Sequence, residues 1–459
     1  MTLERRPARP DRLSAMDVTN LMVEARGVVM HVAALAVLDG RPLRDPAGEV
    51  RLDAVREYVS ARLPRRLRQR LVLPPRGMAR GAAHGGPRWS APGAIDLTRH
   101  VRTRALDPPA DEAALLETCT RINERPLDRR YPLWEMWLLT GLPENRVGLF
   151  LRLHHVIADG VAVLGLLESL FEGAPGAPPH GQVTDPGAGR GDATVRDAAE
   201  RAPTRQGLRA TTRAVATGAR LTAARAVETA GVLRAGRAPA VSFNRPVGGR
   251  SRVVLARADL ARTKAVAHAH GGKVNDVVLA AVAGGARRLL EQRGELSDDL
   301  VLRVSVIASL RDPAAARSDG APGNLTGVRV VPVPVGEADP VRRLKRIAAH
   351  TAARRGRPPL RPGGRLLRRW MVGVMNHQRM VNLLVSNLPG PTAPLVFAGA
   401  PVLELFQLGT NQGNLALSVG VLSYAGTLEI DVVGDGDVVP DLDAFVSGLT
   451  DTLVQLGAC

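Results

Sequence analysis

Two long stretches of alternating strand-like and helix-like sequence flank a segment that is poor in large apolar side chains. The first stretch runs from about residue 27 to 172, and the second from about 246 to 459. Residues 173–206 consist mostly of Gly, Ala, Pro, Asp and Arg, a composition typical of a flexible linker. Because strands alternate with helices on both sides of it, the chain is expected to be an α/β protein with two sheet-containing domains. Its 459 residues are also too many for one ordinary hydrophobic core.

The first stretch contains three apolar runs of strand length and three segments with helical spacing. Strands are expected at residues 27–38, 134–140 and 146–154, and helices at 51–72, 111–124 and 161–171. Residues 74–98, rich in Gly, Pro and Arg, are expected to form a loop. The second stretch predicts strands at 251–257, 301–308, 326–335, 382–387, 415–424 and 427–433, and helices at 275–292, 340–353 and 441–456. We therefore predict an N-terminal domain at 1–172 and a C-terminal domain at 246–459, joined by residues 173–245, whose Ala- and Arg-rich part at 207–236 favours helix.

The chain is strongly basic, with 62 Lys and Arg against 44 Asp and Glu, a net charge of +18. Such a surface attracts polyanions, which include nucleic acid, anionic lipid and phosphorylated cofactors. Aromatic residues make up only 3% of the chain, which leaves few platforms for base stacking, and no zinc-finger or RNA-binding aromatic motif is present. We therefore expect no nucleic-acid partner, while an ordinary solvated Arg-rich surface explains the charge as well as an anion site does.

The cysteine content and the N-terminus indicate the compartment. Two cysteines, Cys119 and Cys459, do not form a disulfide framework and fit a reducing cytoplasm. The polar N-terminus lacks the apolar core of a signal peptide, and no stretch approaches 18 consecutive apolar residues. We expect a cytoplasmic protein whose membrane contact, if any, is peripheral.

The motif HHVIADG at residues 154–160 lies between an expected strand and an expected helix. Catalytic side chains often lie at such junctions, because the scaffold is rigid and the loop is open. His155 can take and return a proton near neutral pH, which makes it the candidate general base. Asp159 can cap the following helix or pair with an arginine, and Gly160 permits a tight turn.

Other interpretations of the paired histidines remain open. Adjacent side chains at the end of a strand point to opposite faces, which disfavours joint metal binding, and no other His, Cys, Asp or Glu cluster has metal spacing. We therefore expect no metal site. A serine hydrolase would need G-x-S-x-G, which is absent. Two structural loop histidines followed by an aspartate cap would produce the same motif without catalysis.

Further motifs follow in order along the chain. They are LSAMD at 13–17, Met30–His31–Val32, PLDRRYPLWE at 126–135, Asn275–Asp276, Ser309–Leu310–Arg311, Gly323–Asn324 and SNLPGP at 386–391. Together with HHVIADG they resemble the bacterial wax ester synthase/diacylglycerol acyltransferase family, within the CoA-dependent HHxxxDG acyltransferases that include chloramphenicol acetyltransferase. The resemblance covers nearly the whole chain. Ala15 stands where the family usually has proline, and residues 354–369 are unusually basic.

The resemblance implies two chloramphenicol-acetyltransferase-like sandwich domains with mixed sheets, joined by a linker and a helical crossover, with an active-site tunnel between them. It implies acyl-CoA as substrate, no permanently bound cofactor, and a diacylglycerol or long-chain alcohol as acceptor, giving triacylglycerol or wax ester. His155 would remove the acceptor's hydroxyl proton as it attacks the thioester, then return the proton to the leaving thiolate. His154 and Asp159 would orient the loop.

The remaining motif residues have less specific expectations. The oxyanion needs a donor, for which the candidates are Asn275, Ser386 and Asn387. Asn275 and Asp276 would equally cap a helix, and SNLPGP would equally form a turn, with Pro389 and Gly390 serving backbone geometry. Structural roles are expected for Pro132, Leu133, Trp134, Arg311, Gly323 and Asn324, with Trp134 also a candidate for lining a substrate channel.

Two other functions remain alternatives. One is an acyltransferase for a specialised metabolite, and the other is a non-catalytic lipid-binding homologue. A condensation domain proper is disfavoured, because no carrier or adenylation segment accompanies it. Residues 207–236 and 354–375 combine basic and apolar residues, a pattern that fits peripheral binding to a membrane or lipid droplet and fits solvated helix equally well.

Overall fold

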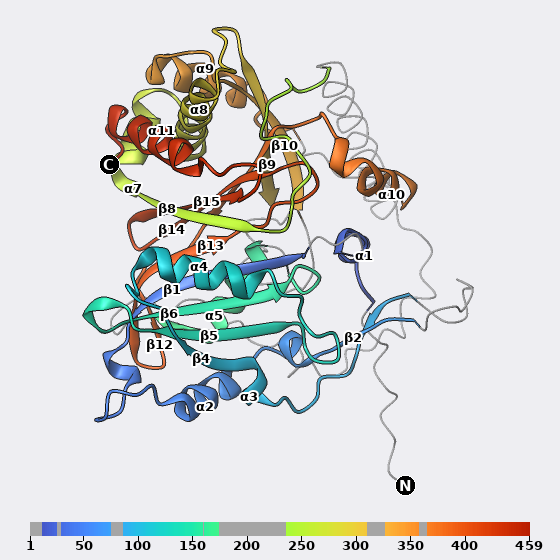
Figure 1. Cartoon of the computed structure of the whole chain (residues 1–459), viewed down its shortest axis with the longest axis vertical. Helices are drawn as coiled ribbons and strands as arrows, with labels where there is room; N and C mark the ends of the chain where they lie inside the picture. The colour runs from blue at the N-terminus through green and yellow to red at the C-terminus, as the bar shows by residue number, and fades with distance from the viewer. Residues whose placement is uncertain are drawn as a thin grey trace, which may run out of the picture.

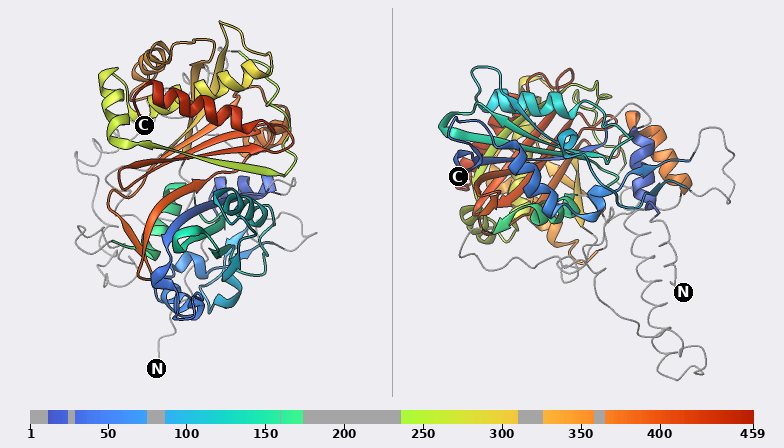
Figure 2. Two further views of the ribbon diagram at one scale, coloured as in Figure 1. Left: turned by 60° about the vertical axis from the view of Figure 1, so that its left-hand side comes forward. Right: turned by 90° about the horizontal axis from the view of Figure 1, so that it is seen from below.

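Two large β-sheets form the centre of the molecule, with helices packed against them (Figures 1 and 2). The computed structural model describes residues 12–24, 29–74, 86–158, 160–173, 236–309, 326–357 and 365–459. Both sheets contain parallel and antiparallel strands. The predicted α/β class with two mixed sheets is therefore confirmed.

The first sheet has seven strands in the order β4-β5-β6-β1-β13-β12-β7. Their bounds are Val101–Ala105 for β4, Trp134–Thr140 for β5, Arg146–His154 for β6, His31–Asp39 for β1, Ala400–Leu408 for β13, Leu395–Phe397 for β12 and Glu172–Gly173 for β7. Only β4 and β5 run parallel to each other. Two strands from the predicted C-terminal domain (246–459) thus complete the sheet of the predicted N-terminal domain (1–172).

The first sheet is covered on both faces. Successive residues of a strand point to opposite faces, so Leu35 and Phe150 pack under α4 (Glu112–Asn123) while Leu149 and Leu151 pack on the other side. That second face is covered by α2 (Leu52–Arg62) and α5 (Gly160–Leu170). Burial on both faces explains why β1 and β6 are nearly continuous apolar runs.

The second sheet has six strands in the order β10-β9-β11-β14-β15-β8. Their bounds are Thr326–Pro334, Val301–Ser309, Leu383–Pro389, Leu417–Tyr424, Thr427–Asp435 and Ser251–Asp259. Helices α7 (Leu260–Ala269), α8 (Val274–Gln292), α9 (Pro340–Ala352) and α11 (Leu442–Gln455) lie on its face away from the first sheet (Figure 1). Residues of α8 and α11 form a core there with the strands, including Leu279, Val304 and Phe445.

Helices α1 (Ala15–Glu24) and α10 (Arg365–Val374) lie side by side at one edge of the molecule, away from the sheet-covering helices (Figures 1 and 2). Val23 and Val372 form a small apolar cluster with Met30, just before β1. Helix α1 is thereby packed against a helix of the second half.

The structure corrects several expectations. The helix expected over 51–72 ends at Arg62, because Pro64 lacks an N–H and holds Leu63 in an extended conformation. Residues 71–100, expected in part as loop, contain the β2–β3 hairpin (Leu71–Val72 and Arg88–Trp89) and α3 (Leu97–His100). Strand β11 continues to Pro389, and the structure adds five elements that were not predicted from the sequence: α1, β4, α7, β12 and β13.

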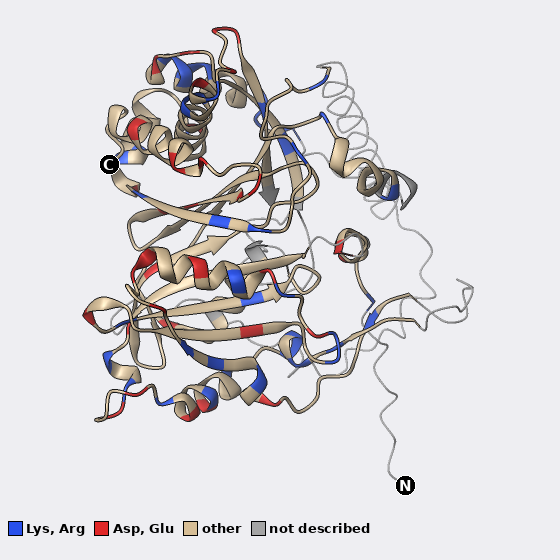
Figure 3. Cartoon of the chain, viewed as in Figure 1, with Lys and Arg blue, Asp and Glu red and all other residues tan. Residues whose placement is uncertain are grey.

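Most of the predicted linker and helical segment, residues 174–235, lies outside the described residues. Over the part of the chain that the structure describes, no helix is both long and apolar enough to cross a bilayer. Lys and Arg are spread over both halves rather than gathered on one element (Figure 3).

Candidate active site

His154 is the last residue of β6 and lies opposite His31 of β1. Its side chain is 1% exposed. Its Nδ1 accepts a hydrogen bond from the backbone N–H of Val156 at 2.9 Å, and its Nε2 lies 3.1 Å from Oε2 of Glu24. Because Nδ1 is an acceptor, the ring proton is on Nε2. Nδ1 of His154 is therefore occupied by the backbone, and Nε2 is buried beside the Glu24 carboxylate without forming a hydrogen bond.

His155 begins the turn that follows the strand, and it is only half-buried. Its backbone N–H donates to the carbonyl of Met30 at 2.8 Å. The Asn20 side-chain Nδ2 lies 3.2 Å from the carbonyl oxygen of His155 and 3.4 Å from its Nδ1. The turn is thus held by β1 on one side and by α1 on the other.

The residues of the PLW motif are packing and positioning residues. The carbonyl of Leu133 accepts the backbone N–H of His154 at 2.9 Å, which fixes the end of β6. Trp134 is fully buried, and its indole N–H donates to the carbonyl of Leu67 at 2.9 Å while the ring stacks on His100. The carbonyl of Pro132 accepts the N–H of Trp134 at 3.0 Å. Trp134 lies in the core under the histidine strand, so packing accounts for its position.

A buried polar group supports β6 on the face under α4. Arg152 lies 2.8 Å from Glu135 of β5 and donates to the carbonyl of Arg125 at 2.6 Å and to that of Ile122. His31 Nδ1 lies 2.9 Å from the carbonyl of Asn123. Burial, reinforced by the nearby Arg152 charge, lowers the pKa of His31 to about 3, so this histidine stays neutral.

The second half brings its candidate amides together at the start of α8 and in β11. Asn387 Nδ2 lies 3.5 Å from Oδ1 of Asn275. Asp276 is buried; one of its oxygens accepts the N–H of Lys273 at 2.8 Å and the other accepts the hydroxyl of Thr351 at 2.8 Å. Asp276 therefore caps α8, as expected of an acidic residue in the first turn of a helix.

Gln407 connects the two sheets where Ser386 lies. Its backbone belongs to β13 and pairs with Ala34 of β1. Its side-chain Nε2 donates to the carbonyls of Ser386 and Val421, each at 2.8 Å, and its Oε1 lies 3.4 Å from the hydroxyl of Ser386. The SNLPGP strand is thereby tied to the sheet that carries the histidines, a link that the sequence analysis missed.

Pro389 and Gly390 shape the end of β11. Pro389 pairs with Ser423 of β14, and a Cβ on Gly390 would lie 2.4 Å from the carbonyl oxygen of that serine. The position accordingly requires glycine because the two backbones approach closely.

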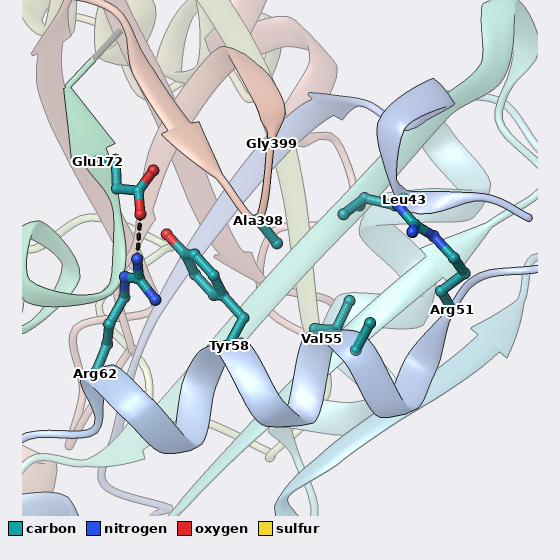
Figure 4. Close-up of a pocket in the computed structure, with 9 residues that line it drawn as sticks. Leu43, Arg51, Val55, Tyr58, Arg62, Glu172, Ala398 and Gly399 are labelled. Atoms are coloured by element: carbon teal, nitrogen blue, oxygen red, sulfur yellow. Dashed lines mark hydrogen bonds and ion pairs between the residues drawn. The ribbon is translucent and has the colours of Figure 1, made fainter. Parts of the chain in front are cut away.

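Two of the cavities in the described part of the molecule involve elements near the sheets. One, of about 180 Å³, is lined by both halves: Cys119 and Asn123 of α4, Val29 before β1, Gly409 after β13 and Asp435 of β15 are among its walls. Val29 adjoins Met30, which holds the His155 turn. The other, of about 280 Å³, lies between α2 and the β12–β13 turn, beside the Arg62–Glu172 ion pair and Tyr58 (Figure 4).

Some candidate residues cannot be placed in this site. Asp159, Arg311, Gly323 and Asn324 lie outside the described residues, and Gly160 begins α5. Within the described ranges, His, Cys, Asp and Glu side chains form no group of three that would hold a metal ion. Sequence reasoning gave no signal for Asn20 and Glu24, because α1 was not expected.

Two family models together match most of this chain. A family model described as the wax ester synthase/diacylglycerol acyltransferase catalytic domain matches residues 13–278, and the model of the C-terminal domain of that family matches residues 322–457. A Mycobacterium tuberculosis protein named as a probable diacylglycerol O-acyltransferase, tgs1, is 30% identical over 98% of this chain and 96% of its own length.

Solved structures give the same fold. The wax ester synthase/diacylglycerol acyltransferase of Marinobacter aquaeolei VT8 matches with a TM-score of 0.66 at 23% identity, covering 98% of both chains. The first condensation domain of the calcium-dependent antibiotic synthetase matches with a TM-score of 0.64 at 19% identity, covering 99% of this chain and 98% of that one. These likenesses confirm the predicted two-domain acyltransferase fold.

Proposed function

Because this chain belongs to the wax ester synthase/diacylglycerol acyltransferase family, we propose that it transfers a fatty acyl group from acyl-CoA to a lipophilic alcohol. The acceptor is diacylglycerol or a long-chain alcohol, and the product is triacylglycerol or a wax ester. The names of the curated relatives support diacylglycerol as the first acceptor to test.

In this proposal His155 is the general base. The observation that carries the choice is the environment of the neighbouring histidine: His154 is 1% exposed, its Nδ1 accepts the Val156 N–H, and its Nε2 is buried 3.1 Å from a Glu24 oxygen. A base needs a nitrogen lone pair that the substrate can reach, which His154 does not offer. His155 lies at the half-buried turn after the strand, where a substrate can approach.

The reaction needs one proton to move twice. His155 takes the proton from the acceptor hydroxyl as its oxygen attacks the thioester carbonyl, and the C–S bond then breaks as the tetrahedral intermediate collapses. The proton goes to the CoA thiolate, so the enzyme ends unchanged. Base assistance of this kind contributes about 10²–10⁴ in rate, and holding both substrates together supplies much of the rest.

The oxyanion donor is proposed to be the Asn275 amide. The Oδ1 of Asn275 faces Nδ2 of Asn387. This contact orients the Asn275 amide, so the Nδ2 of Asn275 is directed away from Asn387 and keeps its donors for another acceptor. The Ser386 hydroxyl lies against Gln407, an arrangement that favours a structural role for this serine. One preorganised donor contributes about 10²–10³ in turnover, so Asn275→Ala is expected to fall below wild type by about that factor.

A single assay tests the function. Purified protein receives acyl-CoA donors of several lengths with diacylglycerol, a fatty alcohol or no acceptor, and release of CoA and formation of ester are followed. We expect ester with the lipophilic acceptors and a loss of about 10²–10⁴-fold in His155→Ala. Equal CoA release by wild type and His155→Ala with every acceptor would exclude the base. Ester formed only with small polar alcohols would exclude the lipophilic acceptor while leaving His155 in place.

Peripheral docking on a lipid surface is proposed for α10. Trp370 is 59% exposed there and follows the exposed Arg369, a pairing suited to the headgroup region of an anionic membrane. Vesicles containing anionic lipid are expected to float the wild-type protein at low salt and Trp370→Ala less well. Val454→Ala, which removes a similarly exposed apolar side chain on α11, is the matched control. Equal flotation of the two variants would contradict docking through α10.

A further inference from the structure

Helix α1 presents two polar side chains to the two histidines of the motif. Asn20 and Glu24 are four residues apart, so they lie on the same face of the helix. Glu24 contacts His154, and Asn20 contacts His155. We infer that α1 is a positioning helix, in which Glu24 holds the ring of His154 and Asn20 holds the turn that carries the catalytic His155. This inference rests on the proposed function.

The LSAMD segment explains why a helix starts where it does. The Ser14 hydroxyl accepts the N–H of Asp17 at 3.1 Å, and the Asp17 carboxylate accepts the N–H of Ser14 at 2.7 Å. This reciprocal pair is a capping box, which satisfies two backbone donors at the start of the helix. The capping box sets the register of α1, and the register decides that Asn20 and Glu24 face the histidines.

Glu24 lies against the ring of His154, with Oε2 3.1 Å from Nε2. Glu24 is 13% exposed and also pairs with Arg129 of the PLDRRYPLWE segment. Burial alone would raise its pKa, but the interactions with His154 and Arg129 outweigh burial and lower it to about 2. The ionised carboxylate beside Nε2 and the backbone N–H on Nδ1 together favour one orientation of the buried ring.

The Asn20 contact fixes His155 directly. The backbone N–H of His155 is bonded to Met30, and Asn20 Nδ2 lies 3.2 Å from its carbonyl oxygen, so both backbone polar groups of the catalytic residue are held. The ring is placed with Nδ1 toward α1, 3.4 Å from the same amide. The amide of Asn20 is therefore placed to hold both the backbone and the ring of His155. A displacement of the base by about 1 Å can cost about 10²-fold in rate.

The test replaces the contacts while keeping the helix. Asn20→Leu has nearly the same shape and a better helix propensity, but it lacks the amide. We expect its kcat to fall about 10- to 100-fold with KM within about twofold and an unchanged unfolding temperature. Glu24→Gln, which keeps an acceptor for His154, is expected to lose less activity than Glu24→Leu. Val18→Ala, on the same helix, is the matched control and is expected to keep wild-type kcat.

A double-mutant cycle separates positioning from general damage. If Asn20 acts through His155, Asn20→Leu has no further effect in a His155→Ala background, whereas an independent structural effect appears in full. Wild-type kcat in Asn20→Leu, an equal loss in Val18→Ala, or additive losses in the double variant would each overturn the inference. Full activity in His155→Ala alone would instead overturn the proposed base, so the two failures are distinguishable.

Discussion

Two pairs of polar side chains, one in each sheet, differ in how their charges are satisfied. In the first sheet, Arg152 and Glu135 form an ion pair that is completed by backbone carbonyls. In the second, the carboxyls of Glu429 and Asp431 are buried on β15, and each has one oxygen without a hydrogen-bond partner. Burial raises the pKa of both to about 7. Arg152 and Glu135 are thus paired as charges, while burial favours the protonated form of Glu429 and Asp431.

The sheets also differ in how they are assembled. All six strands of the second sheet come from residues after 250, but the first sheet takes β12 and β13 from the far half of the chain. The sheet that carries His154 is therefore incomplete without the second half of the chain. Four predictions test these differences between the two sheets.

The largest effect is expected from separating the halves. Residues 1–245 alone leave β1 without its partner β13, so one edge of a buried apolar strand is unpaired. We expect this fragment to aggregate, and to become soluble when residues 246–459 are expressed with it. Solubility and circular dichroism provide the measurement. A cooperative thermal transition for residues 1–245 alone would show that this half folds without residues 246–459.

The paired charges of the first sheet predict the next largest effect. Arg152→Met leaves Glu135 without its closest partner and the nearby carbonyls without a donor, which should lower the unfolding free energy by about 3 kcal/mol. Arg152→Met combined with Glu135→Leu removes both charges and is expected to recover part of the loss. Urea unfolding measures both, and a double variant no more stable than the single one would argue against the pairing.

The raised pKa values of Glu429 and Asp431 predict that the stability of the fold decreases as the pH rises. A carboxylate paired with a cation has the opposite effect, because its contribution to stability is lost as the pH falls. The folded pKa of Asp431 is about 7 against an ordinary 3.8, so the folded state holds a proton that the unfolded chain releases. Its contribution to stability is complete below about pH 4 and is lost as pH rises to about 7. Between pH 5 and 8 Asp431→Asn should therefore gain about 2 kcal/mol relative to wild type.

The pH series has its own control within the sheet. Glu429 shares the raised pKa, so wild type and Asp431→Asn both retain its dependence and only the difference between them reports on Asp431. The measurement is the unfolding free energy of both proteins at each pH. Parallel curves for the two proteins would show that Asp431 is ionised in the folded state.

The smallest effect is expected at the contact between α1 and α10. Val372→Ala removes two methyl groups from the cluster with Val23 and Met30, which should cost about 1–2 kcal/mol of stability. Because α1 holds the histidines, kcat should also fall, by less than in Asn20→Leu. Steady-state kinetics below the unfolding temperature test this. An unchanged kcat would show that the contact with α10 does not affect the active site.

Features with a local cause were predictable from the sequence. The ends of β5 and β6 agree with expectation at both termini, because apolar runs between turn residues define them. The helix α4 was also predicted, and its cause is local as well, because the Asp111 side chain caps its first turn. The family resemblance likewise depended on motifs that are contiguous in the chain.

Features with a distant cause were not predictable. Strand β13 is a strand because β1 pairs with it more than 360 residues away along the sequence, which no window of sequence reveals. Asn20 and Glu24 have unremarkable neighbours, and only the packing of α1 against the end of β6 gives them a function. Gln407 belongs to the same group, because its partners are backbone carbonyls of another sheet.

The pairing of β13 with β1 also restricts how the enzyme can move during turnover. The ladder from Ala33–Leu408 to Leu38–Val402 lies inside the first sheet, so β12 and β13 belong to that sheet's rigid body although they come late in the sequence. Breaking that many backbone hydrogen bonds in each cycle would be costly, so any opening between the two sheets should leave the ladder intact. We therefore expect such a motion to bend the connections that join β12 and β13 to the second sheet, from Pro389 to Leu395 and from Leu408 to Leu417.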